Sequence, residues 1–226
     1  MANAGPLETA RRLSETTYKE WTYGAKASDQ QIDCVQFMAA VIAEELGRPL
    51  TLTERNAINI NHGWSSEEVQ SKAKAGTEPL VSGLVHALVD LMRVGKQVSA
   101  AEAKPGDFVQ YWKRNAEGRW FGHASLLGTV TDRKASLYGS HKSTNGIAES
   151  TFELLLEGTD RHVFLARLDE GVRSRMQVSR DGTIWLPGEM ATKDQDAFRW
   201  TLEYKRWGMV DLQAHFHSSA EPNDYT

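Results

Sequence analysis

The hydrophobic pattern of the chain changes its period near residue 100, and this change sets the fold class. Before it, apolar residues recur at helical spacing over residues 7–21, 34–46, 53–60 and 80–94. After it, apolar and polar residues alternate over residues 108–112, 120–131, 135–139 and 162–168, as is typical of strands. The sequence therefore predicts an α+β domain in which N-terminal helices pack on an antiparallel sheet.

The length of 226 residues is enough for one full hydrophobic core and an extension. We expect a domain over residues 1–170 and a C-terminal extension over 171–226 with a partly disordered tail. Within the extension, residues 173–187 predict a hairpin that turns at Asp181-Gly182. The aromatic residues between Phe198 and Trp207 make that stretch a candidate docking helix, and 218–226 has the composition of a disordered end.

Composition and charge exclude several classes of protein. A net charge of −4, without a run of Lys and Arg, argues against a nucleic-acid partner. Residues 1–20 are too polar for a secretory signal, and no stretch approaches the roughly 20 apolar residues of a membrane span. We therefore expect a chain that is cytoplasmic as synthesised and does not insert into a membrane; export by a non-classical route remains an alternative.

The metal-binding residue types are sparse. The single cysteine excludes an intramolecular disulfide framework and a cysteine-rich zinc site. His215 and His217 could lie on one side of a strand, but neither an HExxH motif nor a carboxylate–histidine cluster accompanies them. No metal and no cofactor are expected.

Cys34, the single cysteine, lies at the predicted start of a helix. Asp33 is a good N-cap, which puts Cys34 at the first helical position, and Gly47 ends the helix. The helix dipole and the unpaired N–H groups of the first turn favour a thiolate there. The alternative is a buried cysteine that fills space as a small hydrophobic side chain.

His123 is the candidate base for this thiol. It lies in a predicted strand between Gly122 and Ala124, and small neighbours leave room for a substrate to approach. If this strand pairs with the next one across the turn at 132–134, the end of the second strand lies near His123. His141 is the first choice for the residue that orients the imidazole, with Ser140 and Asn145 as alternatives.

The oxyanion of an acyl-transfer reaction needs at least two hydrogen-bond donors. The backbone N–H of Cys34 is one candidate, because amides at a helix start are unpaired. The second donor is left open between Tyr23, Gln30 and Gln31, which precede the helix.

These residues and their order resemble the NlpC/P60 superfamily of papain-like cysteine hydrolases, which includes CHAP-type amidases. The matching motifs follow the family's order over residues 23–168: Tyr23-Gly24, Asp33-Cys34-Val35-Gln36-Phe37, Gly106-Asp107-Phe108-Val109 and Gly122-His123-Ala124. Val35-Gln36 replaces the family's Ser-Gly after the cysteine, and the segment between the cysteine helix and the Gly-Asp strand is long.

The resemblance implies a cysteine peptidase or amidase that hydrolyses an amide bond, with peptides of the bacterial cell wall as the leading substrate class. Cys34 and His123 would form a thiolate–imidazolium pair, and the reaction would pass through an acyl-enzyme. One alternative is a non-catalytic binding protein on the same scaffold, with a protein partner docked through the C-terminal extension. Another is a thiol acyltransferase or deamidase that acts on a different amide.

Overall fold

A computed structural model describes residues 5–59, 67–68, 71, 79–114, 116–118, 120–170 and 172, together with the backbone of four short strands between 177 and 217. The sequence also predicts a turn at Asn61-His62-Gly63-Trp64 and a helix that starts at Ser65-Ser66-Glu67-Glu68, and most of these residues fall outside this part of the chain. The structure divides into two compact units, Met1–Glu170 and Gly171–Thr226. The candidate site lies in the first unit.

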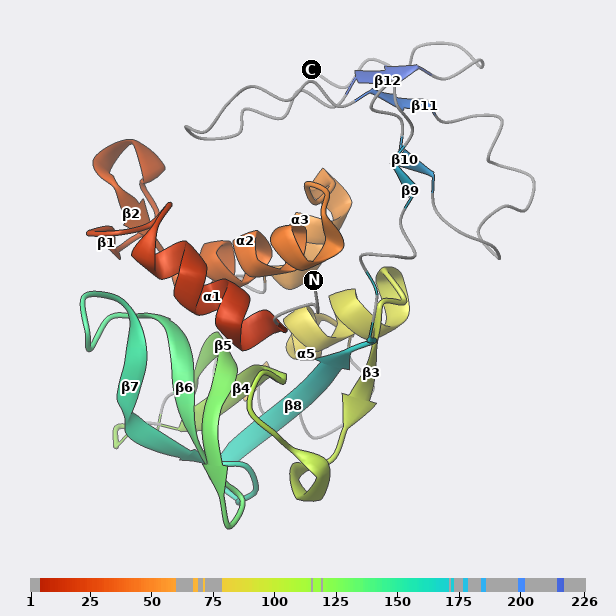
Figure 1. Ribbon diagram of the computed structural model, residues 1–226. Helices are drawn as coiled ribbons and strands as arrows, with labels where there is room; N and C mark the ends of the chain where they lie inside the picture. The colour runs from red at the N-terminus through yellow and green to blue at the C-terminus, as the bar shows by residue number, and fades with distance from the viewer. Residues whose placement is uncertain are drawn as a thin grey trace. The chain divides into compact units, whose positions relative to one another are not determined.

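The helices of the first unit are short and clearly bounded (Figure 1). Their bounds are α1 Pro6–Glu15, α2 Cys34–Leu46, α3 Leu52–Ile58 and α5 Pro79–His86, which continues into a π-helical turn, Ala87–Leu91. The expected helix over 7–21 is too long, because Thr16 leaves the helical conformation and Trp21 packs edge-on against Tyr18. The expected helix over 80–94 also ends early, and Gly83 kinks it with φ 25°.

Six strands form one antiparallel sheet in the order β3-β8-β4-β5-β6-β7 (Figure 1). The strands are β3 Gly95–Val98, β4 Phe108–Arg114, β5 Trp120–Thr131, β6 Lys134–His141, β7 Gly146–Leu155 and β8 Arg161–Leu168. The predicted α+β class with an antiparallel sheet is confirmed. Sequence analysis missed the two edge strands: half of the residues of β7 are exposed, and β3 is only four residues long.

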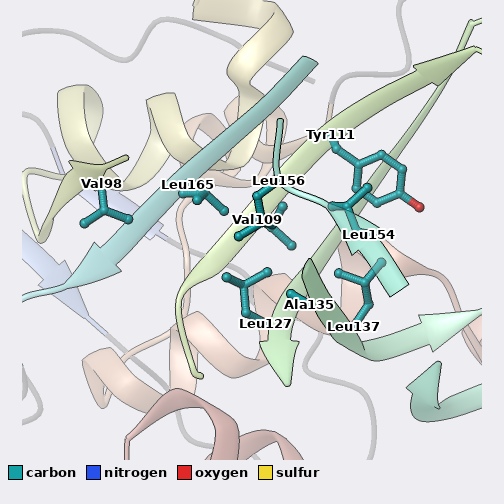
Figure 2. Close-up of a cluster of buried hydrophobic side chains, with 9 residues drawn as sticks. All are labelled: Val98, Val109, Tyr111, Leu127, Ala135, Leu137, Leu154, Leu156 and Leu165. Carbon is teal, nitrogen blue, oxygen red and sulfur yellow. The ribbon is translucent and has the colours of Figure 1, made fainter. Parts of the chain in front are cut away.

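Each face of the sheet has its own apolar packing. Phe108, Leu126 and Tyr138 are direct neighbours across β4, β5 and β6. The Tyr138 hydroxyl shares a 2.8 Å hydrogen bond with Ser14 of α1, so this face is the one that α1 and α2 cover. Along each strand, the residues next to Phe108, Leu126 and Tyr138 point their side chains to the opposite face. Figure 2 shows the buried cluster there: Val98, Val109, Tyr111, Leu127, Ala135, Leu137, Leu154, Leu156 and Leu165.

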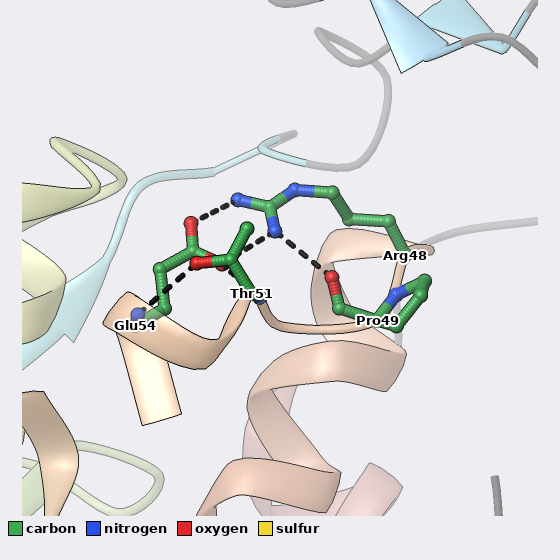
Figure 3. A network of polar contacts seen from close by, with 4 residues as sticks. All are labelled: Arg48, Pro49, Thr51 and Glu54. Carbon is green, nitrogen blue, oxygen red and sulfur yellow. Dashed lines mark hydrogen bonds and ion pairs between the residues drawn. The ribbon is translucent and has the colours of Figure 1, made fainter. Parts of the chain in front are cut away.

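A nearly buried ion pair fixes the connection between α2 and α3 (Figure 3). The guanidinium of Arg48 donates two hydrogen bonds to Glu54, and it also donates to the Pro49 carbonyl at 2.9 Å. Glu54 and the N-cap Thr51 form a capping box, in which Glu54 accepts from the Thr51 amide at 2.8 Å. These contacts hold α3 directly after the end of α2.

In the second unit the described backbone consists of two antiparallel strand pairs. β9 Gln177–Val178 pairs with β10 Ile184–Trp185, as the hairpin prediction requires, although the predicted turn at Asp181-Gly182 lies outside the described residues. β11 Arg199–Thr201 pairs with β12 His215–His217, so the docking-helix prediction is wrong for those three residues of β11. The predicted disordered end, 218–226, and the side chains of His215 and His217 lie outside the described residues.

Within the described part of the chain, no helix has both the length and the apolar character to cross a membrane.

Candidate active site

Cys34 occupies the first position of α2, as the sequence predicts. Asp33 caps the helix: its carboxylate accepts from the Gln36 amide at 2.8 Å, and the Gln36 side chain accepts from the Asp33 amide at 3.2 Å. Gly47 ends the helix in the left-handed conformation with φ 67°. The reciprocal capping bonds leave the amides of Cys34 and Val35 free to face the thiol, and backbone hydrogen bonding from both acts on its sulfur.

The segment before α2 is held by the sheet and by a short strand pair. β1 Thr22–Tyr23 runs parallel to β2 Gln31–Ile32, a pairing that sequence analysis did not anticipate. The buried Ser140 hydroxyl at the end of β6 donates to the Ile32 carbonyl at 2.6 Å. The end of β6 is therefore tied to the residues that immediately precede the cysteine helix.

The thiol lies where β5 and β6 separate. The last register pair between these strands at this end is Leu126 with Tyr138, although both strands continue further. The Leu127 amide donates toward β4, to Asp107, so the amide of Ala124, three residues away, points to the opposite edge, toward β6. Ala124 hydrogen-bonds to Cys34 instead, which puts the sulfur next to the residue that follows His123.

His123 and His141 are hydrogen-bonded across this opening. His123 Nε2 lies 2.8 Å from His141 Nδ1, and the ring centroids are 4.9 Å apart. His141 Nε2 lies 3.2 Å from the Leu137 carbonyl. A carbonyl can only accept, so in the neutral ring His141 carries its proton on Nε2 and accepts from His123 through Nδ1. Neutral His123 is then protonated on Nε2, and its Nδ1 is a free base.

Burial opposes charge on the thiol. Desolvation raises the pKa of Cys34, and the nearby Asp33 carboxylate raises it further. Backbone hydrogen bonds from Ala124, Val35 and Cys34 itself lower the pKa, as the helix-start argument predicts. The net direction is upward, because at this site burial outweighs the backbone donors.

Burial also keeps the two imidazoles neutral. Desolvation, with a smaller effect of His141, lowers the pKa of His123 from 6.5 to about 3. Desolvation lowers the pKa of His141 too, although hydrogen bonding with the backbone at Leu137 and Ala148 acts in the opposite direction. Near neutral pH the site therefore holds a neutral thiol and a neutral histidine pair whose tautomers are fixed by their hydrogen bonds.

Of the remaining candidates, the structure brings Tyr23 and His141 to the site and gives Gln31, Ser140 and Asn145 other surroundings. Burial, followed by the charges of Cys34 and Asp33, raises the pKa of the Tyr23 hydroxyl, which therefore remains a hydrogen-bond donor. The side chain of Gln31 lies over Gly24. Asn145 lies in the exposed turn after β6, with φ 49°. Of the three residues proposed to orient His123, only His141 contacts it by a hydrogen bond that the structure records; Ser140 bonds to Ile32.

Sequence analysis missed Tyr111, whose ring centroid lies 5.7 Å from that of His123. Burial first, then the charge of Cys34, raises the pKa of the Tyr111 hydroxyl. If residues 115–118 formed a four-residue hairpin turn, as the sequence suggests, His123 would lie opposite Gln110. In the structure Arg114 pairs with Trp120, which shifts the register by one residue and places His123 opposite Tyr111.

Among the residues that the structure describes, no group of three or more His, Cys, Asp or Glu side chains could hold a metal ion. The groups that the site brings together are the thiol, the histidine pair, the tyrosine hydroxyls and the backbone amides.

Comparisons with known proteins identify no family for this chain. No family model matches it. No curated protein matches it. Among solved structures, the chain is similar to an N-acetylmuramoyl-L-alanine amidase from Bacteroides uniformis, with 12% identity over 74% of this chain and 100% of that one, and a TM-score of 0.35. Because a TM-score below 0.5 does not establish a common fold, we base the function proposed below on the residues of the site.

Proposed function

We propose that the protein is a papain-like cysteine peptidase or amidase that hydrolyses an amide bond. The observation that carries the proposal is the single thiol at a helix start, hydrogen-bonded to the amide of Ala124, the residue that follows a histidine whose ring is held by a second histidine. A nucleophile, an adjacent base and a residue that orients the base are the three parts of a thiol hydrolase site.

In the first step, His123 Nδ1 takes the proton of the Cys34 thiol as the sulfur attacks the amide carbonyl. The thiolate–imidazolium pair forms at this point, because burial disfavours either charge alone in the resting site. The C–N bond then breaks, and the imidazolium gives its proton to the leaving amine. His141 supports the transfer by accepting the hydrogen bond from His123 Nε2.

The oxyanion of the tetrahedral intermediate accepts hydrogen bonds from two groups, one at the start of α2 and one on β1. One donor is the Cys34 amide, which the capping box leaves free of an intrahelical partner. The other is the Tyr23 hydroxyl, which the raised pKa keeps protonated. Water, deprotonated by His123, then attacks the thioester, releases the carboxylic acid and restores the thiol. The reaction needs no cofactor.

The substrate class we propose is the peptide of the bacterial cell wall or a fragment of it. This choice rests on the ordered motifs that the chain shares with the NlpC/P60 superfamily, from Tyr23-Gly24 to Gly122-His123-Ala124. The same thiol chemistry also serves an acyltransferase or a deamidase, in which the acyl acceptor or the leaving group differs.

The test is hydrolysis of purified cell-wall peptides, followed by mass spectrometry of both products and protein. We expect turnover by the wild type, an acyl adduct on Cys34 at short times, and a loss of at least about a thousandfold in C34A and H123A with the fold retained. Full activity in C34A would contradict the proposal. Transfer of the acyl group to an added amine in preference to water would identify an acyltransferase.

A second candidate function, a binding protein on the same scaffold, is favoured by one observation. Burial raises the pKa of the Cys34 thiol and lowers that of His123, as expected for side chains that fill a core. Alkylation of the thiol at several pH values, in the wild type and in H123A, separates the two functions. A rate near neutral pH that falls in H123A supports the hydrolase, whereas a thiol that reacts only on unfolding, with or without His123, supports the binding protein.

A further inference from the structure

The register between β5 and β6 changes by one residue partway along the strands. Near the turn that joins them, Val130 pairs with Ala135. Further along, Leu127 pairs with Leu137, so the two β5 residues in between face a single β6 residue, Ser136. This arrangement is a β-bulge, which inserts one extra residue into β5.

The bulge decides whether the two histidines can meet. If the register of Val130 and Ala135 continued unchanged, His141 would lie opposite Ala124, whose side chain points to the other face from that of His123. A slip of one residue moves every side chain of a strand to the opposite face. With the bulge, the register continued beyond Leu126 and Tyr138 puts His123 opposite His141, where the 2.8 Å hydrogen bond forms.

Ser136 holds the bulge from both neighbouring strands. Its hydroxyl accepts from the Thr129 amide of β5 at 2.7 Å and donates to the Glu149 carboxylate of β7 at 2.5 Å. Gly128 leaves the space for this contact, because a Cβ there would lie 2.5 Å from the Ser136 hydroxyl and 2.6 Å from the Glu149 carboxylate. The extra residue therefore has a specific set of partners.

We infer that Ser136 is a positioning residue for the candidate active site: through Thr129 and Glu149 it fixes the bulge that brings His123 and His141 onto one face. Its effect on turnover rests on the proposed hydrolase function, whereas its effect on the histidine pair does not. Ser136 precedes His141 by five residues, about 16 Å along an extended strand, so it acts only through strand register.

The test compares S136A, which removes both hydrogen bonds, with S136T, which keeps the hydroxyl. The readout independent of substrate is the NMR signal of the His123 Nε2 proton, which the bond to His141 protects from exchange and which is assigned by its loss in H141F. We expect the signal to be lost in S136A and restored in S136T. The matched control is S99A, which removes another serine–glutamate hydrogen bond, to Glu102 at 2.7 Å.

If the chain is a hydrolase, kcat of S136A should fall about tenfold or more with KM little changed. The reason is that the bulged register becomes less populated when Ser136 loses its hydrogen bonds to Thr129 and Glu149. The inference is overturned if the imidazole signal is absent from the wild type, persists in S136A, or is lost equally in S136T or S99A. If the wild type is inactive but its imidazole signal still depends on Ser136, the proposed function is wrong and the positioning role of Ser136 is supported.

A second pair of variants tests the hydrogen bond between Ser136 and Glu149 from its exposed partner. Glu149 is exposed, so changing it does not empty the interior even if S136A fails to fold. E149Q keeps a side-chain oxygen that accepts from Ser136, and E149A does not. We expect the imidazole signal to weaken in E149A and to remain in E149Q; equal signals in both variants would overturn the inference.

Discussion

At the scale of single residues, the site sets backbone donors against burial. The amides of Ala124, Val35 and Cys34 all act to lower the pKa of the thiol, yet its net shift is upward. Similar donors stabilise an oxyanion during a reaction, when charge appears only briefly. A resting neutral thiol with aligned donors is therefore compatible with a nucleophile that is activated only when a base takes its proton during the attack.

Tyr23 gives a prediction at this scale. Y23F removes a hydroxyl that the raised pKa keeps protonated beside Cys34, so we expect kcat/KM to fall about 10- to 100-fold through loss of an oxyanion donor. Thermal unfolding should change little. The control is Y138F, which removes the hydrogen bond to Ser14 and should cost about 1 kcal/mol of stability with unchanged turnover. Equal kcat/KM in Y23F and wild type would assign the second donor elsewhere.

At the scale of elements, the end of β6 serves as a frame with two faces. Ser140 and His141 are adjacent, so their side chains point to opposite sides of the strand. Ser140 bonds to Ile32 before the cysteine helix, and His141 bonds to His123 on β5. One short segment of strand therefore positions both the nucleophile's helix and the base.

This frame predicts the effect of S140A. The Ile32 carbonyl loses a buried donor, so we expect a loss of stability of about 1–3 kcal/mol. The start of α2 should also move relative to β5, lowering the rate of Cys34 alkylation or hydrolysis at temperatures where the protein remains folded. The comparison is S14A, a hydroxyl on α1 bonded to Tyr138. If S140A loses stability without any change at the thiol, Ser140 supports only the fold.

Elements whose signals are local could be predicted from the sequence, and those set by distant contacts could not. The start and end of α2 follow from Asp33 and Gly47, which act on their own helix. The pairing of β1 with β2 and the edge strand β7 depend on partners elsewhere in the chain. The candidate site follows the same division: Cys34, His123 and His141 could be chosen from residue type and order, whereas the bulge that aligns the histidines could not.

At the scale of the whole first unit, a buried ion pair joins strands that are far apart in sequence. Asp107 is almost completely buried and accepts from Arg167 of β8 at 2.7 and 2.8 Å, and from the Lys104 amide at 2.8 Å. We expect D107A to cost about 1–3 kcal/mol, because the Lys104 amide and the Arg167 guanidinium lose a buried acceptor. The exposed pair of Arg133 and Glu157 is the control, and E157A should cost less than about 1 kcal/mol. Urea denaturation measures the free energy of unfolding of both variants. Similar losses would show that the burial of Asp107 adds nothing to what its ion pair contributes to stability.

Acid unfolding of the whole unit should draw on two groups that titrate in overlapping ranges, of which only the histidine range extends above pH 4.5. Above about pH 3 folded His123 is neutral, whereas in the unfolded chain it binds a proton below pH 6.5. The unfolded state therefore binds more protons in that window, and stability falls as the pH is lowered from 6.5 toward 3, by up to about 1.4 kcal/mol per pH unit for one proton. For Glu54, burial acts to raise the pKa, but the hydrogen bonds and charge of Arg48, with Thr51, outweigh it and hold the pKa below 4.5.

The stability that Glu54 contributes is therefore present above pH 4.5 and is lost as the pH falls through its lowered folded pKa.

Two variants show which residue causes the loss of stability in each pH range. H123N removes the titrating ring while its amide can still donate to His141, so it should reduce the slope of the stability profile between pH 6.5 and 4.5 and leave the part that the lowered pKa of His141 contributes. E54Q should leave that range unchanged and reduce the further loss below pH 4.5. Denaturant unfolding at half-unit pH intervals measures both. If H123N keeps the wild-type slope above pH 4.5, the histidine at the centre of the site is not held neutral by folding, and the resting state proposed for the thiol–histidine pair must be replaced by a charged one.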